Sequence, residues 1–205
     1  MLNYREGRFD DMNKTMEMQP IALKEWASAI SALQEGKQIL IMRKGGIVEE
    51  TRDFQLKSRS FYLYPTYEHQ RKELLKEENA GLVDETLAGW SPEDTTVTLT
   101  AYAEAVEDIE IVDQEQLNLL RELHIWTDHF AEERLKWKRK NPLHVVILRV
   151  YKLRQPLIAS ILPEYVGCKS WLCIEEGSGT FEASPVLSDE QFDAARRRIH
   201  EALGR

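Results

Sequence analysis

Leu143-His-Val-Val-Ile-Leu-Arg-Val-Tyr151 is the stretch of the chain most typical of a β-strand. Its β-branched residues favour a pleated backbone, and we expect the strand to run over 143–153. Because side chains alternate along a strand, Val146, Leu148 and Val150 are predicted to share one buried face. The other residues, His144, Val145, Ile147, Arg149 and Tyr151, are expected to divide between a basic surface and a second buried side.

Other strands and helices are predicted on both sides of this segment. Thr96–Val112 is rich in Val, Thr and Ile, which indicates one long bent strand or two strands. Shorter strands are expected over 38–43, 61–64 and 170–174, and a loop between Pro156 and Pro163. Helices are expected from Ile21 to Leu33 with Gly36 as the C-terminal cap, from Thr66 through Lys76, from Asp113, from Thr127 or Asp128, and over 188–203 with a Ser188–Gln191 capping box.

These elements do not alternate regularly between strand and helix. An α+β fold is therefore predicted, with a mixed, mostly antiparallel sheet or a small barrel and flanking helices. The chain has 205 residues, of which 42% are apolar and 30% charged, values typical of a folded domain. Residues 1–18 are expected to form a flexible N-terminal tail, 19–205 a single globular domain, and 79–95 a solvated connection inside it.

Charge and cysteine content narrow the possible settings. A formal net charge of −8 argues against a surface built throughout for polyanions, although a local basic patch remains compatible with it. There is no apolar run of membrane-spanning length, so we expect no membrane insertion. The two cysteines, Cys168 and Cys173, are five residues apart in a predicted strand and would point to opposite faces. This spacing favours a reducing cytoplasm, and the sequence contains no recognised metal or cofactor motif.

Several multi-residue phrases are distinctive. They are Ala22–Ala27, Leu40–Ile47, Phe61–Gln70, His124–Trp126, Leu148–Tyr151 and Gly167–Trp171. Together they resemble the bacterial family catalogued as domain of unknown function 1802, from about Ile21 to about Ile174. The resemblance implies no activity, so candidate sites must be derived from the chemistry of the side chains.

The clearest charged feature is a basic stretch between Arg134 and Lys152. It holds seven cations and no acid: Arg134, Lys136, Lys138, Arg139, Lys140, Arg149 and Lys152. Trp137 lies within it, so cations for phosphates are mixed with a ring on which a base can stack. A polyanion surface is one interpretation, and a solvated helix end and loop is the other.

A second cationic feature is the turn Arg43-Lys44-Gly45-Gly46. Backbone N–H groups of such a glycine turn can converge on an anion, beside two cations. Lys169 and Thr66 are further candidate anion contacts. The alternative is a plain hairpin turn with charged flanks. Neither the P-loop nor the dinucleotide fingerprint is present.

Catalytic chemistry is suggested by the segment Tyr64–Gln70. If Thr66 caps a helix, His69 lies in the first turn, where the helix dipole keeps an imidazole neutral and suited to a general base, with Glu68 orienting a partner. Cys168, next to Lys169, is a candidate nucleophile. The alternatives are a histidine packed on Tyr67 and a buried structural thiol.

Two functions of different classes follow. The favoured one is a module that binds RNA, single-stranded DNA or a nucleotide; the alternative is a small hydrolase or transferase acting on a phosphate- or acyl-containing substrate. An adaptor that uses Trp26, Trp126 and Trp171 as partner contacts is a third reading. For the first two, Arg43, Lys44, the segment 66–70 and Arg149 are predicted to converge on one concave surface.

Overall fold

A computed structural model describes residues 14–44, 54–136, 142–167 and 169–205. The strands are β1 Lys14–Met18, β2 Ile21–Trp26, β3 Leu40–Arg43, β4 Ser60–Thr66, β5 Thr96–Ile111, β6 Leu143–Ser160, β7 Trp171–Cys173 and β8 Gly179–Pro185. The helices are α1 Ala27–Gln34, α2 Gly81–Leu87, α3 Gln114–Leu119, α4 Asp128–Lys136 and α5 Asp189–Ala202. Short 3₁₀ turns lie at Lys72–Leu74, Glu77–Asn79, Arg121–Leu123, Pro163–Tyr165 and Glu175–Gly177.

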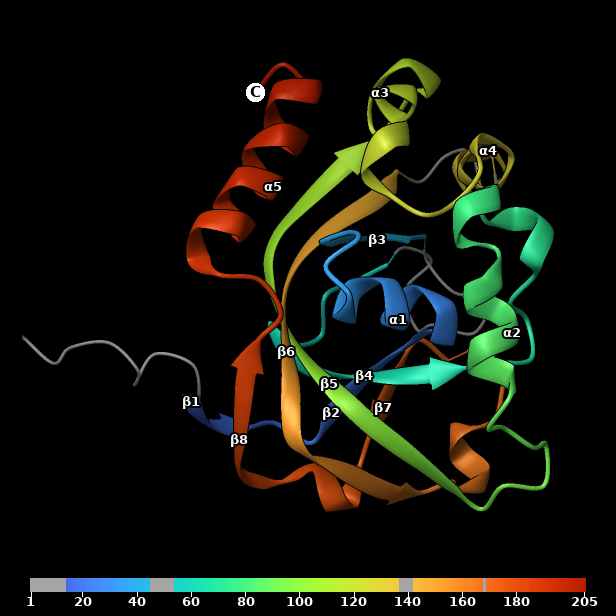
Figure 1. The fold of residues 1–205 in the computed structure, drawn as a ribbon, viewed down its shortest axis with the longest axis vertical. Helices are drawn as coiled ribbons and strands as arrows, with labels where there is room; N and C mark the ends of the chain where they lie inside the picture. Colours follow the sequence, from blue (N-terminus) through green and yellow to red (C-terminus); the bar gives the residue numbers. More distant parts are fainter. Residues whose placement is uncertain (1–13, 45–53, 137–141, 168) are drawn as a thin grey trace, which may run out of the picture.

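The strands form one mixed sheet in the order β1-β8-β6-β5-β4-β2-β7, with β3 on β6. Only the β2–β4 pair is parallel among the strand pairs of the described residues. β3 and β8 pair with different parts of the same edge of β6, and β5 occupies its other edge. Figure 1 shows β5 and β6 side by side along the molecule, with α3, α4 and α5 at one end. The predicted α+β class is confirmed.

β5 and β6 form the backbone of the fold. Of the two alternatives predicted for 96–112, one long strand or two strands, the structure has the single strand, Thr96–Ile111, and its register on β6 shifts at Leu99/Ala101 and Ala105/Glu107. The predicted loop after Pro156 is wrong, because β6 continues to Ser160. Pro156 lies inside the first register shift, where a ladder hydrogen bond from its backbone nitrogen is not required.

Alternation along the strands separates two buried layers. Val146, Leu148 and Val150 lie in one cluster, as predicted, and Leu143, Val145 and Ile147 lie in the cluster beneath the helices. The first cluster also takes residues from β2, β3, β4 and β5, so the sheet curls around it. Ile30 and Leu33 of α1 close over its inner side. The sheet is not a closed barrel, because β3 pairs with β6 and with neither β2 nor β7.

Two N-terminal predictions are wrong. Lys14–Met18 do not belong to a flexible tail, because they form β1 and pair with β8; residues 1–13 lie outside the described residues. Ile21–Trp26 are a strand rather than the start of a helix. These residues pair with β4 on one side and β7 on the other, and that long-range pairing outweighs their helical spacing. The helix begins only at Ala27.

The segment after β4 also differs from its prediction. Thr66 ends β4 and caps no helix, so His69 lies in a turn, and a single 3₁₀ turn follows at Lys72–Leu74. The expected connection over 79–95 contains α2. Gln70 is buried and links the two neighbouring helices: its Oε1 accepts from Ser28 N at 3.0 Å, and its Nε2 donates to Thr86 Oγ1 at 3.0 Å.

Helix boundaries elsewhere follow the predicted caps. Asp113 Oδ1 accepts from Gln116 N at 2.8 Å, Thr127 Oγ1 from Phe130 N at 3.3 Å, and Ser188 forms a capping box with Gln191. Gly36, at a φ of 69°, ends α1 in the left-handed conformation. In the described part of the chain, no helix combines the length and apolarity that a membrane crossing needs.

Candidate functional site

A polar cluster lies at one end of the curled sheet. Arg43 follows Ile41 on the inner face of β3, and Glu25 follows Leu23 on the inner face of β2, because side chains alternate. Arg43 and Glu25 are thus the last inward-facing side chains of β3 and β2, next to apolar ones. The apolar interior therefore finishes in a guanidinium group facing a carboxylate, and we name Glu25, Arg43, Arg134 and Ser170 the Arg43 cluster.

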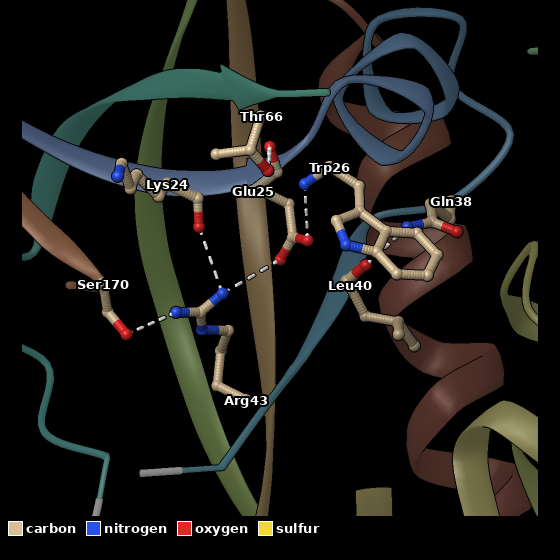
Figure 2. A network of polar contacts seen from close by, with 8 residues as sticks. All are labelled: Lys24, Glu25, Trp26, Gln38, Leu40, Arg43, Thr66 and Ser170. Atoms are coloured by element: carbon tan, nitrogen blue, oxygen red, sulfur yellow. Dashed lines mark hydrogen bonds and ion pairs between the residues drawn. The ribbon is translucent and has the colours of Figure 1, made fainter. Parts of the chain in front are cut away.

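The guanidinium of Arg43 connects β3 to β2 and to the residue before β7, although β3 has no ladder with either strand in the described residues. Its Nη1 donates to Lys24 O at 3.1 Å, and its Nη2 donates to Ser170 Oγ at 2.6 Å. Figure 2 shows Arg43 reaching from β3 toward both partners, with the Glu25 carboxylate beside it. The Arg43 side chain is only 11% exposed, yet its Nε has no hydrogen-bond partner among the residues that the structure describes. A buried, unsatisfied donor is costly, so this N–H is a point where a ligand acceptor would be stabilised.

Glu25 is a buried carboxylate held in place by its own backbone. Its Oε1 accepts from Trp26 N at 2.8 Å, and its Oε2 lies 3.5 Å from Arg43 Nη1. Thr66 Oγ1 donates to the Glu25 carbonyl oxygen at 3.0 Å, which ties the end of β4 to the same residue. The carboxylate is thus fixed in orientation before any ligand arrives.

Arg134 brings a second guanidinium toward the cluster from α4. It lies over the Phe130 ring at 5.0 Å, and Phe130 packs on Trp26 at 5.1 Å. Desolvation lowers the pKa of Arg134, the positive charge of Arg43 lowers it further, and Glu25 raises it. Among the residues that the structure describes, no carboxylate forms an ion pair with Arg134.

Lys44 is buried nearby, and its position has a structural explanation. Its Nζ donates to the carbonyl oxygen of Leu135 in the last turn of α4, where the helix dipole favours a cation. Burial lowers the pKa of its ammonium group. Lys44 therefore fastens α4 to the end of β3 and helps to hold Arg134 beside Arg43.

Aromatic rings flank the cluster on the side of β7. The Phe54 ring lies 5.6 Å from the Arg43 guanidinium carbon and 6.1 Å from the Trp171 ring, to which it is nearly parallel. Phe54 also contacts His144, at 5.5 Å between ring centres. His144 Nδ1 lies 2.9 Å from Asp108 Oδ1, so this histidine already has a carboxylate partner.

A comparison with family models decides the identity. One model matches residues 22–198, which is most of the chain. The chain belongs to the domain of unknown function family DUF1802. No curated protein and no solved structure matches it. The matched part of this DUF1802 chain includes every member of the Arg43 cluster.

The structure joins some of the predicted site residues of this DUF1802 domain and separates others. Arg43 and Thr66 both contact Glu25, and Arg134 lies close enough to affect both charges. Arg149 does not join them: it lies on the opposite face of β6 from His144, where it donates to Ser188 O at 3.2 Å and Asp189 Oδ1 at 2.7 Å. The predicted convergence of Arg149 with Arg43 is therefore wrong, because Arg149 anchors α5.

The remaining candidates lie outside the cluster or outside the described residues. His69 and Glu68 are exposed on the turn after β4. Lys136 pairs with Glu132 at 2.9 Å, and Lys169 donates to Glu164 O at 3.0 Å. The candidates Gly45, Gly46, Trp137, Lys138 and Cys168 lie outside the described residues.

Two members of the cluster have no distinctive sequence pattern. Glu25 lies in a segment whose apolar spacing predicts a helix, and Ser170 is an uncharged residue that no motif singles out. Only the pairing of β2 with β7 brings them to Arg43. Within the described ranges, no group of three or more His, Cys, Asp or Glu side chains is arranged to hold a metal ion.

Proposed function

We propose that this DUF1802 domain binds a phosphate-bearing ligand, a nucleotide or a nucleic-acid strand, at the Arg43 cluster. One observation carries the proposal: the Arg43 guanidinium is largely out of water with one carboxylate, Glu25, 3.5 Å away, and Arg134 lies near enough for the charges of both to act on it. Like charges repel, and burial penalises each of them. A phosphate between the two guanidinium groups would supply the missing negative charge and accept several hydrogen bonds.

The unsatisfied donor supports the same proposal. Within the described part of the chain, the Nε–H of Arg43 is buried without an acceptor, whereas both Nη atoms are hydrogen-bonded. A phosphate oxygen is an acceptor suited to guanidinium geometry. The fixed partners of Arg43 would keep the group oriented before binding, which reduces the entropy lost when the ligand is bound.

An extended basic surface contributes less to this proposal than the sequence predicts. Lys136 is paired with Glu132, and Arg149 is paired with Asp189. Arg134 lies on Phe130 and partly away from solvent. Among the described cations of the basic stretch, Lys136 and Arg149 are thus already paired, so we propose that the ligand meets the protein mainly through one or two phosphates at the Arg43 cluster. We place this binding in the bacterial cytoplasm, as the cysteine spacing and the family resemblance lead us to expect.

The test is binding at low salt, measured with a fluorescein-labelled thymidine oligonucleotide by anisotropy and with ATP by calorimetry. We expect Arg134→Met to weaken binding of the preferred ligand at least tenfold, because the variant lacks one of the two guanidinium groups that would hold the phosphate. The variant should still fold, since the described contacts of Arg134 are few. Arg154→Met is the matched control. Arg154 is exposed and pairs with Glu182 away from the cluster, so the affinity of this variant for the same ligand should stay within twofold of the parent's.

The result that would overturn the proposal is equally clear. If the parent protein binds neither probe at about 20 mM salt, the cluster is not a phosphate site. His69→Ala addresses the hydrolase or transferase alternative, since an exposed His69 should leave binding unchanged. Hydrolysis of a phosphate ester or acyl ester by the parent that disappears in His69→Ala would favour the enzyme instead.

A further inference from the structure

We infer that Trp171 stacks on an unpaired nucleobase of the ligand whose phosphate binds the Arg43 cluster. This inference rests on the proposed function and specifies its ligand class: a phosphate joined to a base with a free face. It concerns a residue that directly follows Ser170, the hydrogen-bond partner of Arg43.

The geometry places Trp171 one ring away from the guanidinium. Phe54 contacts both, with its ring centre 5.6 Å from Arg43 Cζ and 6.1 Å from the Trp171 ring centre and the two rings at 21° to each other. Phe54 is 3% exposed, whereas Trp171 remains partly accessible. Trp171 is therefore a partly accessible large ring that the described contacts connect to Arg43, through Phe54 and through the neighbouring Ser170.

The indole is held rigidly enough to act as a platform. Its Nε1 donates to Gln55 O at 3.0 Å, and Phe61 packs against it edge-on at 5.1 Å. The backbone of Trp171 pairs with Leu23 in β2. A ring that is already oriented loses little entropy on stacking, and stacking on an aromatic side chain does not depend on base identity.

The other described tryptophans are less suitable. Trp26 and Trp126 are 8% and 1% exposed, and both pack on Phe130. Trp90 is partly accessible, as Trp171 is, and also stacks on one ring, that of Tyr67 at 5.3 Å, but it has no described contact with Arg43, Phe54 or Ser170. Trp90 is therefore the natural control for Trp171.

The experiment compares ATP with inorganic triphosphate, both in buffer without divalent cations, by calorimetry on the full chain. We expect the parent to bind ATP about tenfold more tightly than triphosphate, because stacking adds to the phosphate contact. Trp171→Leu should remove this difference and leave triphosphate affinity unchanged. Trp171→Phe should retain part of the difference, and Trp90→Phe should retain all of it.

Two controls separate the possible failures. Circular dichroism establishes that each variant is folded, and Trp171→Phe provides a conservative variant if Trp171→Leu is not. Equal affinity of the parent for ATP and triphosphate would overturn the inference while leaving the proposed function intact. Absence of binding to either compound and to oligonucleotide would overturn both.

Two further probes identify the source of the base. A single-stranded thymidine oligonucleotide that binds more tightly than ATP would indicate a strand, and the reverse order would indicate a free nucleotide. In either case, weaker binding of the preferred ligand by Trp171→Leu supports stacking, and unchanged binding contradicts it. A duplex that competes as well as the single strand would contradict it, because paired bases offer no free face to the indole.

Discussion

Ser170 Oγ accepts a hydrogen bond from Arg43 Nη2 over 2.6 Å, and so connects the last residue of β3 to the residue that precedes β7. No backbone ladder joins these two strands among the described residues. The open seam of the curled sheet is thus spanned by side chains, with Arg43 reaching Lys24 O on β2 as well.

Ser170→Ala tests how much this link stabilises the fold. The change removes the acceptor and leaves a buried guanidinium N–H unpaired, so we expect the free energy of unfolding to fall by about 2 kcal/mol. Urea denaturation measures the effect. Ser178→Ala, at an exposed position, should stay within about 0.5 kcal/mol of the parent. An equal and small loss in both variants would mean that the seam contributes little.

Gly36→Ala tests the cap of α1, the helix that closes over the inner cluster. Gly36 has a φ of 69°, and a Cβ there would lie 2.7 Å from Leu187 Cδ2. Strain and contact together should lower the midpoint of thermal unfolding, with a loss of about 1 to 2 kcal/mol. Gly89→Ala is the control, since a Cβ added at Gly89 would have no neighbouring atom within 4 Å. A loss in Gly89→Ala as large as in Gly36→Ala would contradict the explanation.

His124 predicts acid sensitivity. It is 4% exposed, and neither ring nitrogen has a hydrogen-bond partner of ordinary geometry among the described residues. Desolvation first, then the charge of Lys76, lowers its pKa from 6.5 to about 4. Between these values the unfolded chain binds a proton that the folded chain does not. The contribution of His124 to the free energy of unfolding is therefore fully present above about pH 6.5. About 3 kcal/mol of it is lost as the pH falls from 6.5 toward 4.

The measurement is the urea midpoint of the parent and of His124→Phe between pH 7.5 and pH 4. The two curves should diverge as the pH falls, with the variant becoming relatively more stable by about 3 kcal/mol at the acid end. Carboxylates titrate in the same range, but they do so in both proteins and cancel in the difference. Parallel curves would contradict this, because they would show that His124 has the same pKa in the folded and the unfolded chain.

Local patterns predicted the elements that local contacts determine. The caps at Asp113 and Ser188 follow from side chains that bond backbone groups three residues away, and Gly36 follows from its own conformational freedom. The alternation of Val146 and Leu148 likewise depends only on strand geometry. Such signals are contained in a few neighbouring residues.

Long-range pairing determines what the patterns missed. Ile21–Trp26 have helical spacing, but they lie between β4 and β7 and complete both ladders. Lys14–Met18 form a strand by pairing with β8, and no local pattern in the sequence predicts β8. The Arg43 cluster shows the same division: the sequence indicates Arg43 and Arg134 by charge, whereas Glu25 and Ser170 reach them only through the sheet.

Arg149→Leu separates stability from binding. Arg149 is 8% exposed, bonds Ser188 O and Asp189, and lies over Phe192 at 4.8 Å. Its loss should weaken the docking of α5 on β6 and lower the free energy of unfolding by about 2 kcal/mol. The effect should be no larger, because Asp189 is exposed and its ion pair with Arg149 contributes little. ATP affinity should stay within twofold. A tenfold loss of affinity in a folded Arg149→Leu protein would place Arg149 in the binding site.

The salt dependence of oligonucleotide binding distinguishes a compact phosphate site from an extended basic surface. Each phosphate neutralised on a single strand contributes a slope of about −0.7 to the plot of log affinity against log salt. Contact through Arg43 and Arg134 alone predicts about −1.4, and Arg134→Met should reduce this to about −0.7. Participation of all seven cations between Arg134 and Lys152 would give about −5. Lys136→Glu should leave the slope nearly unchanged, because Glu132 already neutralises Lys136. A slope near −5 that Lys136→Glu flattens would move the binding surface from the Arg43 cluster to the basic stretch.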